Sequence, residues 1–304
     1  MMTSEMASAK PADFDEFWEG IDQELARYPA RPELEPLPRH GTDFCDVYAL
    51  RLTSLGPYRI FGYYSVPQGS GPFPALLTTP RYGSVNHVPD YNDRQRYVCL
   101  TLMHRGQRLA DQPYAAAYPG LLTEGIAEAR SYIYRGIAAD CLRGAEFLCD
   151  RPEVDRKRVA VAGDELALIT AARRPGFAVA QAAGLLLYRL AEAAGRSTAY
   201  PVEEINDFLR AHPDQAAAVA RTLAYFDPRH HAPDVTAATI LSLDDEGTLG
   251  GLPWLQPLRD ALGGPVVPYR LCHEGGTDHD QLDALLAARL DVPPLSRFRR
   301  EWPS

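Results

Sequence analysis

The sequence lacks the long apolar run that a membrane-spanning helix needs. Such a helix takes about 18 or more consecutive apolar residues. The longest apolar stretch here, from Phe177 to Tyr188, is shorter and is interrupted by Gln181. Residues 1–16 carry acidic side chains and no apolar core, unlike a secretory signal peptide. We therefore expect no membrane partner and no export signal.

Cysteine is also scarce, with five residues in 304 and no Cys-x-x-Cys pair. An odd number of cysteines without paired spacing argues against a disulfide framework and is typical of reduced thiols. The sequence therefore predicts a cytoplasmic protein in which the cysteines serve as small buried apolar residues.

Positive charge is in short supply. The 31 Lys and Arg residues are outnumbered by 40 Asp and Glu residues, which gives a formal net charge of −9. The basic residues form no cluster that could neutralise phosphates, and no glycine-rich phosphate loop follows any apolar run. These absences argue against nucleic-acid partners and nucleotide ligands, and we expect no cofactor.

Proline, by contrast, is abundant, at 26 of 304 residues, whereas ordinary proteins contain about 5%. The apolar fraction of 46% and the charged fraction of 23% are those of a globular protein. A chain of this length can bury about three quarters of its unfolded surface. We therefore expect a well-packed frame with many stiffened loops.

Short apolar runs alternate with helical patterns over most of the chain. The runs are residues 75–79, 98–103, 159–162, 183–187, 239–243 and 266–271, and helical stretches include residues 133–149, 166–173 and 281–290. Nearly all-apolar strands that alternate with helices predict a parallel sheet covered by helices on both faces. We therefore predict a single α/β domain over residues 1–304.

The first part of the chain has a different pattern. Apolar residues between Phe14 and Leu25 recur at helical spacing, and alternating runs at 47–52 and 58–66 predict an antiparallel strand pair at a sheet edge. We interpret residues 1–45 as an N-terminal helical extension. Residues 189–234, which are polar and helical, are predicted as a cap-like insertion beside the site.

Ligands of an open α/β sheet bind beyond the carboxyl ends of its strands, and three predicted strand ends carry informative residues. The first is the run from Val159 to Ala167, a strand followed by a tight turn and a helix. In α/β-hydrolases the nucleophile stands at such a turn between small residues. Gly163 and Ala167 supply the small residues here, and Glu165 lies between them. In the simpler interpretation, Asp164 and Glu165 are acids favoured by the helix dipole.

The other two strand ends carry a histidine and a group of acids. His273 follows the last predicted strand, and Asp244, Asp245 and Glu246 follow the strand before it. The chain order of turn, acid and histidine is that of the α/β-hydrolases. The alternative is a loop histidine with a satisfied hydrogen bond and an acidic turn that caps the next helix.

Two further groups carry weaker signals. No known metal-ligand spacing fits the group His230, His231, Asp278, His279 and Asp280, so we expect no metal. Three aromatic residues either line a pocket or belong to the core, and these are Tyr188, Tyr200 and Trp254.

Five segments in chain order carry a family resemblance. They are Pro11-Ala-Asp-Phe-Asp-Glu-Phe-Trp18, His104-Arg-Gly-Gln107, Tyr118-Pro-Gly120, Arg221-Thr-Leu-Ala-Tyr-Phe-Asp227 and His273-Glu-Gly-Gly276. Over nearly its whole length the chain resembles the acetyl xylan esterases and cephalosporin C deacetylases of carbohydrate esterase family seven. The resemblance implies an α/β-hydrolase fold, often in a ring-like homo-hexamer. It also implies deacetylation of small esterified sugars or antibiotics by Ser, His and Asp, without a metal.

Carried over residue by residue, the resemblance assigns roles to single positions. The catalytic histidine falls on His273, and the backbone donors of the oxyanion hole fall on Tyr82 and Leu166. The signature Arg and Gln fall on Arg105 and Gln107, which we interpret as mainly structural.

Two positions depart from the family pattern. The serine nucleophile is replaced by Glu165. The catalytic acid falls on or beside Gly247, and Asp245 or Glu246 can replace it only if the loop shifts by one or two residues.

A carboxylate at the turn is a poor acyl nucleophile, because the anhydride it forms is unstable. We therefore predict weak or absent deacetylase activity. In one hypothesis Glu165 acts as general base or nucleophile on a small metabolite, with His273 as its proton partner. In a second, the Glu165 carboxylate folds back onto the backbone amides of Leu166 and Tyr82 and fills the oxyanion hole. The protein is then catalytically silent and binds a ligand or partner. In a third, Cys272 does the chemistry.

Overall fold

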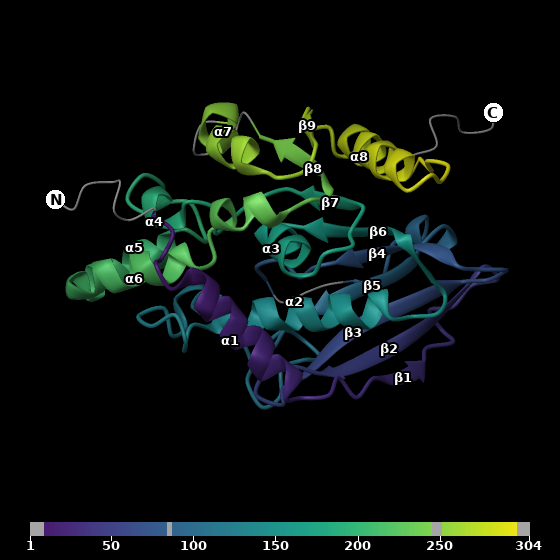
Figure 1. Ribbon diagram of the computed structural model, residues 1–304, viewed down its shortest axis with the longest axis horizontal. Coiled ribbons are helices and arrows are strands. Elements are labelled where there is room, and N and C mark those ends of the chain that lie inside the picture. The colour runs from purple at the N-terminus through teal and green to yellow at the C-terminus, as the bar shows by residue number, and fades with distance from the viewer. Residues whose placement is uncertain (1–8, 84–86, 245–250, 297–304) are drawn as a thin grey trace.

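A nine-stranded mixed sheet forms the centre of the described structure (Figure 1). The computed structural model describes residues 9–83, 87–244 and 251–296. The strand order is β1-β2-β3-β5-β4-β6-β7-β8-β9. The strands are β1 (Glu33–Pro36), β2 (Cys45–Thr53), β3 (Arg59–Pro67), β4 (Phe73–Thr78), β5 (Val98–Met103), β6 (Val154–Gly163), β7 (Val179–Ala182), β8 (Ala238–Leu243) and β9 (Val266–Arg270).

Helices precede, connect and follow the strands. They are α1 (Phe14–Ala26), α2 (Ile133–Cys149), α3 (Glu165–Arg173), α4 (Leu190–Ala193), α5 (Glu203–Ala211), α6 (Ala216–Ala224), α7 (Gly251–Ala261) and α8 (Gly275–Arg289). Short 3-10 turns occur at Asp93–Gln95, Leu121–Thr123, Pro213–Gln215, Pro228–His230 and Ala232–Asp234.

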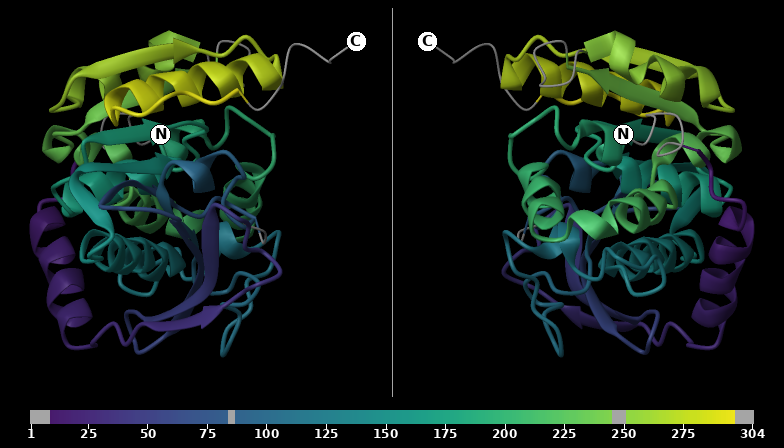
Figure 2. Two further views of the ribbon diagram at one scale, coloured as in Figure 1. Left: turned by 90° about the vertical axis from the view of Figure 1, so that its right-hand side faces the viewer. Right: turned by 90° about the vertical axis from the view of Figure 1, so that its left-hand side faces the viewer.

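The two faces of the sheet are buried by different helices. On one face α2 lies over β4, β5 and β6, and α1 packs on α2. On the other face Leu286 of α8, and Leu290 directly after this helix, pack with Leu76, Cys99 and Val179. Neighbouring residues of one strand point to opposite faces, so Leu77 belongs to the first core while Leu76 belongs to the second. Figure 2 shows α8 at the β9 end of the molecule, away from α1.

The parallel part of the sheet confirms most of the strands and helices expected from the sequence. From β5 through β4, β6, β7 and β8 to β9, every neighbouring pair is parallel. The predicted helix at 133–149 and strand at 98–103 are confirmed with their bounds.

The strand predicted at residues 183–187 is wrong. The register pairs Gly163, the last residue of β6, with Ala182, so β7 ends where β6 ends. The apolar residues that follow form a loop beyond the carboxyl end of β7, and Leu187 is buried there. These residues are apolar because they pack against the core. In the sequence, such a short apolar loop cannot be distinguished from a short buried strand.

The predicted antiparallel pair is β2 and β3, and it lies one strand inside the edge of the sheet. The edge strand is β1, which pairs with β2 from within the proline-rich stretch. The N-terminal extension at 1–45 therefore holds the edge strand as well as helix α1. Pro36 is tolerated in β1 because an edge strand leaves one side of its backbone unpaired.

The segment between β7 and β8 contains α4, α5 and α6, which lie together on the left of Figure 1. It covers the residues predicted as a cap-like insertion. None of the helices in the described ranges is long and apolar enough to cross a bilayer.

The corner between β6 and α3 depends on a glycine. A methyl group on Gly163 would collide with Oγ1 of Thr79, the residue that follows β4. The Thr79 hydroxyl donates to the backbone oxygen of Ala162 at 3.3 Å, which holds it against the corner. The small residue two positions before Glu165 is therefore required by close packing.

We predict that Gly163→Ala lowers the free energy of unfolding by about 1–3 kcal/mol because of overpacking. Thr79→Ala in the same chain removes the colliding oxygen and is expected to recover most of the loss. Urea unfolding of the two single variants and the double variant measures this coupling.

Gly20→Ala in α1 is the matched control, because no heavy atom lies within 4 Å of the added methyl group. It is expected to leave stability unchanged or to raise it by up to ~1 kcal/mol. Equal stability of Gly163→Ala and the wild type would contradict the packing argument.

Candidate active site

Glu165 is the first residue of α3 and lies directly beyond the carboxyl end of β6. Asp164 caps the helix, and its carboxylate accepts a hydrogen bond from the backbone amide of Leu166 at 3.0 Å. An N-cap carboxylate satisfies one of the free amides of the first helical turn and is favoured by the helix dipole. The capping alternative from the sequence therefore holds for Asp164 and leaves the role of Glu165 open.

The Glu165 side chain is buried, with 1% of its surface exposed. Within the described residues its Oε2 atom has no hydrogen-bond partner. Burial raises the pKa of Glu165 well above its ordinary value, and the charge of Asp164 raises it further. Hydrogen bonds from its own backbone amide and from those of Leu187 and Leu186 lower this pKa only in part. The balance favours a protonated, neutral carboxyl group.

Asp164 shares this buried corner. Burial raises the pKa of Asp164 to about 6, while the Leu166 amide and the positive charge of Arg81 oppose the shift. Two carboxyl groups on adjacent residues disfavour a second negative charge. Asp164 carries the hydrogen bond that an ionised acid makes best, so the proton resides more readily on Glu165.

The predicted oxyanion hole is changed at one of its two positions. The Leu166 amide, predicted as an open donor, is taken by the Asp164 carboxylate. The silent-site hypothesis also placed Glu165 on this amide, and that placement is corrected, since Asp164 fills the position. Tyr82 follows β4, and its side-chain hydroxyl contacts Tyr200 at 2.8 Å and Glu204.

His273 follows β9 and pairs with an acid at the end of β8. Its Nε2 atom lies 3.3 Å from Oδ1 of Asp244. The backbone of His273 is left-handed, with φ of 60°, and its side chain is 39% exposed. The acids predicted for this role, Asp245 and Glu246, lie outside the described residues. Glu165 and His273 therefore differ sharply in their exposure to solvent.

Asp244 is a partner that the sequence analysis did not select. The signal for it was present, because Asp244 is the first residue after β8 and β8 pairs with β9 in parallel. The residues that follow two neighbouring parallel strands emerge side by side at one edge of the sheet. An acid there meets a histidine after β9 without any shift of the loop.

Arg105 contacts buried groups on neighbouring elements. Its guanidinium binds the Asp140 carboxylate of α2 through Nε at 3.0 Å and Nη2 at 2.7 Å. Nη2 also donates to the backbone oxygen of Leu55 at 3.0 Å. This two-point ion pair ties the end of β5 to α2 and to the turn before β3.

Gln107 links the end of β5 to the loop that contains Tyr82. Its Oε1 accepts from the backbone amide of His104 at 3.0 Å. Its Nε2 donates to the backbone oxygens of Arg81 at 3.1 Å and Gly83 at 2.7 Å. These bonds fix the backbone on both sides of Tyr82.

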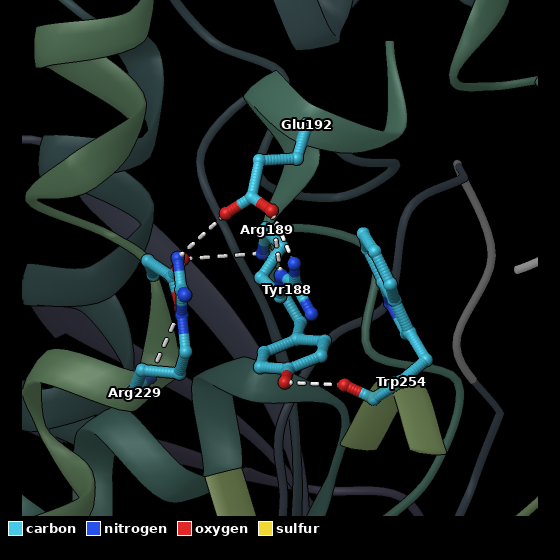
Figure 3. Close-up of polar contacts among 6 residues, drawn as sticks. Tyr188, Arg189, Glu192, Arg229 and Trp254 are labelled. Carbon is cyan, nitrogen blue, oxygen red and sulfur yellow. Dashed lines mark hydrogen bonds and ion pairs between the residues drawn. The ribbon is translucent and has the colours of Figure 1, made fainter. Parts of the chain in front are cut away.

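Two of the three aromatic residues noted in the sequence belong to an ion-pair cluster (Figure 3). The Tyr188 hydroxyl donates to the backbone oxygen of Trp254 at 2.7 Å. The Arg189 guanidinium lies 3.8 Å from the centre of the Trp254 ring. Glu192 binds Arg189 and also Arg229. Arg229 also pairs with Asp227 at 2.7 Å, so each of the two guanidinium groups has a carboxylate partner, and the cluster joins α4 to α7.

The remaining candidates from the sequence are the group of histidines and acids considered for a metal, and Cys272. Among the described residues, no group of three or more His, Cys, Asp or Glu side chains could hold a metal ion. Burial lowers the pKa of His231 to about 3, and its ring packs 4.8 Å from that of Trp18. The Cys272 thiol lies 3.2 Å from Oδ1 of Asp278 and is exposed.

Comparison with known proteins is consistent with this architecture. Residues 1–248 match the sequence profile of the acetyl xylan esterase family. An acetyl esterase of Xylanibacter ruminicola is 25% identical over 182 residues, which cover 54% of this chain and 41% of the relative. The chain therefore spans less than half of that relative's length.

Two solved structures share the fold over almost the whole chain. An acetyl xylan esterase from Paenibacillus sp. R4 aligns with a TM-score of 0.79 and 24% identity, covering 96% of this chain and 100% of the other. Acetyl xylan esterase 1 from Thermoanaerobacterium sp. JW/SL YS485 aligns with a TM-score of 0.78 and 19% identity, covering 96% and 98%. The fold is that of the α/β-hydrolases.

The raised pKa of Glu165 predicts a pH-dependent effect of Glu165→Gln on stability. A carboxyl group whose pKa is higher in the folded state stabilises the fold below the unfolded pKa, about 4.3. That stability is lost as the pH rises toward the folded pKa. Glutamine cannot ionise, so the variant should gain on the wild type by up to ~1.4 kcal/mol per pH unit within this window.

Urea unfolding of both proteins at pH 5, 6 and 7 measures this difference. The free energy of unfolding of Glu165→Gln minus that of the wild type should rise from pH 5 to pH 7. A difference that stays constant or falls as the pH rises would show that Glu165 is ionised in the folded protein.

Proposed function

Because this chain belongs to the acetyl xylan esterase family, we propose that it is a carbohydrate-binding member that has lost acetyl-ester hydrolysis. The observation that carries the proposal is the corner between β6 and α3. A buried carboxyl group stands there at the position of the nucleophile, and a second carboxyl group occupies the neighbouring amide.

The protonation state of Glu165 limits its use as a nucleophile. A serine esterase needs an oxygen that attacks the carbonyl carbon with help from a base. A buried, neutral carboxyl group is a weak nucleophile, and the acyl anhydride that it would form is unstable. Glu165, with 1% of its surface exposed, also has no open path to a substrate in this conformation.

The oxyanion hole is altered as well, independently of the nucleophile. Acyl transfer develops a negative charge on the substrate oxygen, and the amide after the nucleophile stabilises it. Here the Leu166 amide already donates to the Asp164 carboxylate. A carboxylate at this place both occupies the donor and repels the developing charge, so two requirements of the reaction are missing.

Contacts and a cavity at this end of the sheet support ligand binding. Gln107 holds the backbone on both sides of Tyr82, and His273 keeps an acid partner in Asp244. A cavity of about 300 Å³ next to this end of the sheet is lined by Pro119, Glu204 and Phe208, among others. The name acetyl xylan esterase, carried by the family and by the two solved structures, favours a carbohydrate as the ligand.

A second function is favoured by the raised pKa of Glu165. A carboxyl group whose pKa is raised by burial keeps its proton to higher pH, where it can act as a general acid, and is a stronger base once ionised. With His273 as its proton partner, Glu165 would then act on a small metabolite by non-serine chemistry, after the loop at 183–187 opens. Turnover of any metabolite by the wild type that Glu165→Gln abolishes would select this function over the silent one.

A cytoplasmic location and assembly into a homo-oligomer stay predictions from the sequence. Size-exclusion chromatography with light scattering measures the second directly.

The loss of ester hydrolysis predicts a two-step rescue. The wild type and Glu165→Ser should both hydrolyse p-nitrophenyl acetate near the background rate, because Asp164 still occupies the Leu166 amide in the single variant. Asp164→Ala with Glu165→Ser frees that amide and supplies the nucleophile. Its kcat/KM should exceed that of the single variant by about 100-fold, the usual effect of one oxyanion donor.

Asp164→Ala alone is the matched control, because it frees the amide without supplying a nucleophile. It should be inactive, and the thermal midpoints of all variants show whether they fold. A wild type that turns over the ester and loses this activity in Glu165→Gln would contradict the proposal. Equal rates for Glu165→Ser and the double variant would contradict the role given to Asp164.

A further inference from the structure

The structure presents an exposed aromatic ring on a fixed base beside the candidate active site. We propose that Tyr200 is a stacking subsite for one ring of a neutral saccharide. The inference rests on the proposed function, since it specifies where the carbohydrate binds. It assigns a binding role to a residue of the segment between β7 and β8.

Tyr200 combines high exposure with a fixed position. The residue is 56% exposed, which is unusual for a large aromatic side chain. Its hydroxyl lies 2.8 Å from the Tyr82 hydroxyl, and the two rings meet edge to face with centres 5.7 Å apart. A ring held at both its edge and its hydroxyl loses little freedom when a ligand covers its open face, which favours binding.

The base of this arrangement is a buried carboxylate. Glu204 of α5 is 7% exposed, and it accepts hydrogen bonds from the Tyr82 hydroxyl and, at 3.1 Å, from the backbone amide of Leu122. The Tyr82 ring also meets the Tyr118 ring edge to face at 5.3 Å. We call Tyr82, Tyr118, Tyr200 and Glu204 the tyrosine shelf.

The tyrosine shelf lies where a ligand of this fold would bind. Tyr82 follows β4 at the carboxyl end of the sheet, and Gln107 fixes the backbone next to it. The shelf shares Glu204 with the cavity of about 300 Å³ described above, and Asp207 and His212 also line that cavity. A saccharide longer than one unit could place one ring on Tyr200 and offer hydroxyl groups to the cavity.

The chemistry of the shelf selects a neutral sugar. The face of an aromatic ring is electron-rich and attracts the weakly positive C–H groups of a pyranose ring. The Tyr82 hydroxyl donates to Glu204, so the Tyr200 hydroxyl donates to Tyr82 and its own oxygen can still accept from a sugar hydroxyl. The Glu204 carboxylate at the base of the shelf, and a net charge of −9 for the chain, disfavour anionic ligands such as phosphates.

Xylotetraose is the probe, and isothermal titration calorimetry is the measurement. We expect the wild type to bind it and Tyr200→Ala to bind about tenfold more weakly or not measurably, because the stacking surface is gone. Tyr200→Phe keeps the ring and should stay within about threefold of the wild type. Circular dichroism and the thermal midpoint of each variant verify the fold.

Tyr91→Ala is the matched control. Tyr91 is also 56% exposed, but its ring rests on Phe44 rather than on the tyrosine shelf. Its replacement should leave binding of xylotetraose unchanged. Equal losses in Tyr91→Ala and Tyr200→Ala would show non-specific binding and overturn the inference.

The remaining outcomes separate the inference from the function on which it rests. Binding by the wild type that Tyr200→Ala leaves intact overturns the subsite and leaves the proposed function standing. An equal loss in Tyr200→Phe and Tyr200→Ala assigns the effect to the hydroxyl and overturns stacking. No binding of xylotetraose by the wild type overturns the subsite together with the carbohydrate-binding part of the proposed function.

Discussion

The carboxyl group of Glu165 is buried at the corner between β6 and α3, where water cannot solvate a negative charge. An ionised carboxylate in such a place costs several kcal/mol unless it is fully paired. The helix could satisfy one acid well, and Asp164 takes that position through the Leu166 amide. Glu165 is left with neighbouring amides that offset only part of the cost, so neutrality is its favoured state. The interpretation of the site depends on this constraint.

Contacts away from position 165 hold the corner between β6 and α3 in place. Gly163 allows β6 and the end of β4 to approach closely, and the ion pair of Arg105 with Asp140 fixes the end of β5 against α2. These contacts lie in the frame rather than at the reacting position. A frame that packs independently of the nucleophile position tolerates a different residue there, because function in this fold resides in residues placed on the strand ends.

Much of the fold followed from residue patterns, and the misses have physical causes. The helix at 133–149 and the strand at 98–103 were predictable because they are long, regular and nearly all apolar. The run at 183–187 was misread because a buried loop and a buried strand have the same composition. The placement of Glu165 at the turn between β6 and α3 was predictable, whereas its burial depends on the fold of the loop after β7. The pairing of Asp244 with His273 and the base under Tyr200 arise between segments far apart in the chain, which local patterns cannot reveal.

We expect Glu165 to keep its proton in the folded protein at pH 7, because burial and the charge of Asp164 raise its pKa. Infrared difference spectroscopy of the wild type against Glu165→Gln at pH 7 tests it most directly. A protonated Glu165 gives a carboxylic-acid carbonyl band that is present in the wild type, absent in the variant and shifted in heavy water. A difference spectrum that shows only the bands of an ionised carboxylate would contradict the account.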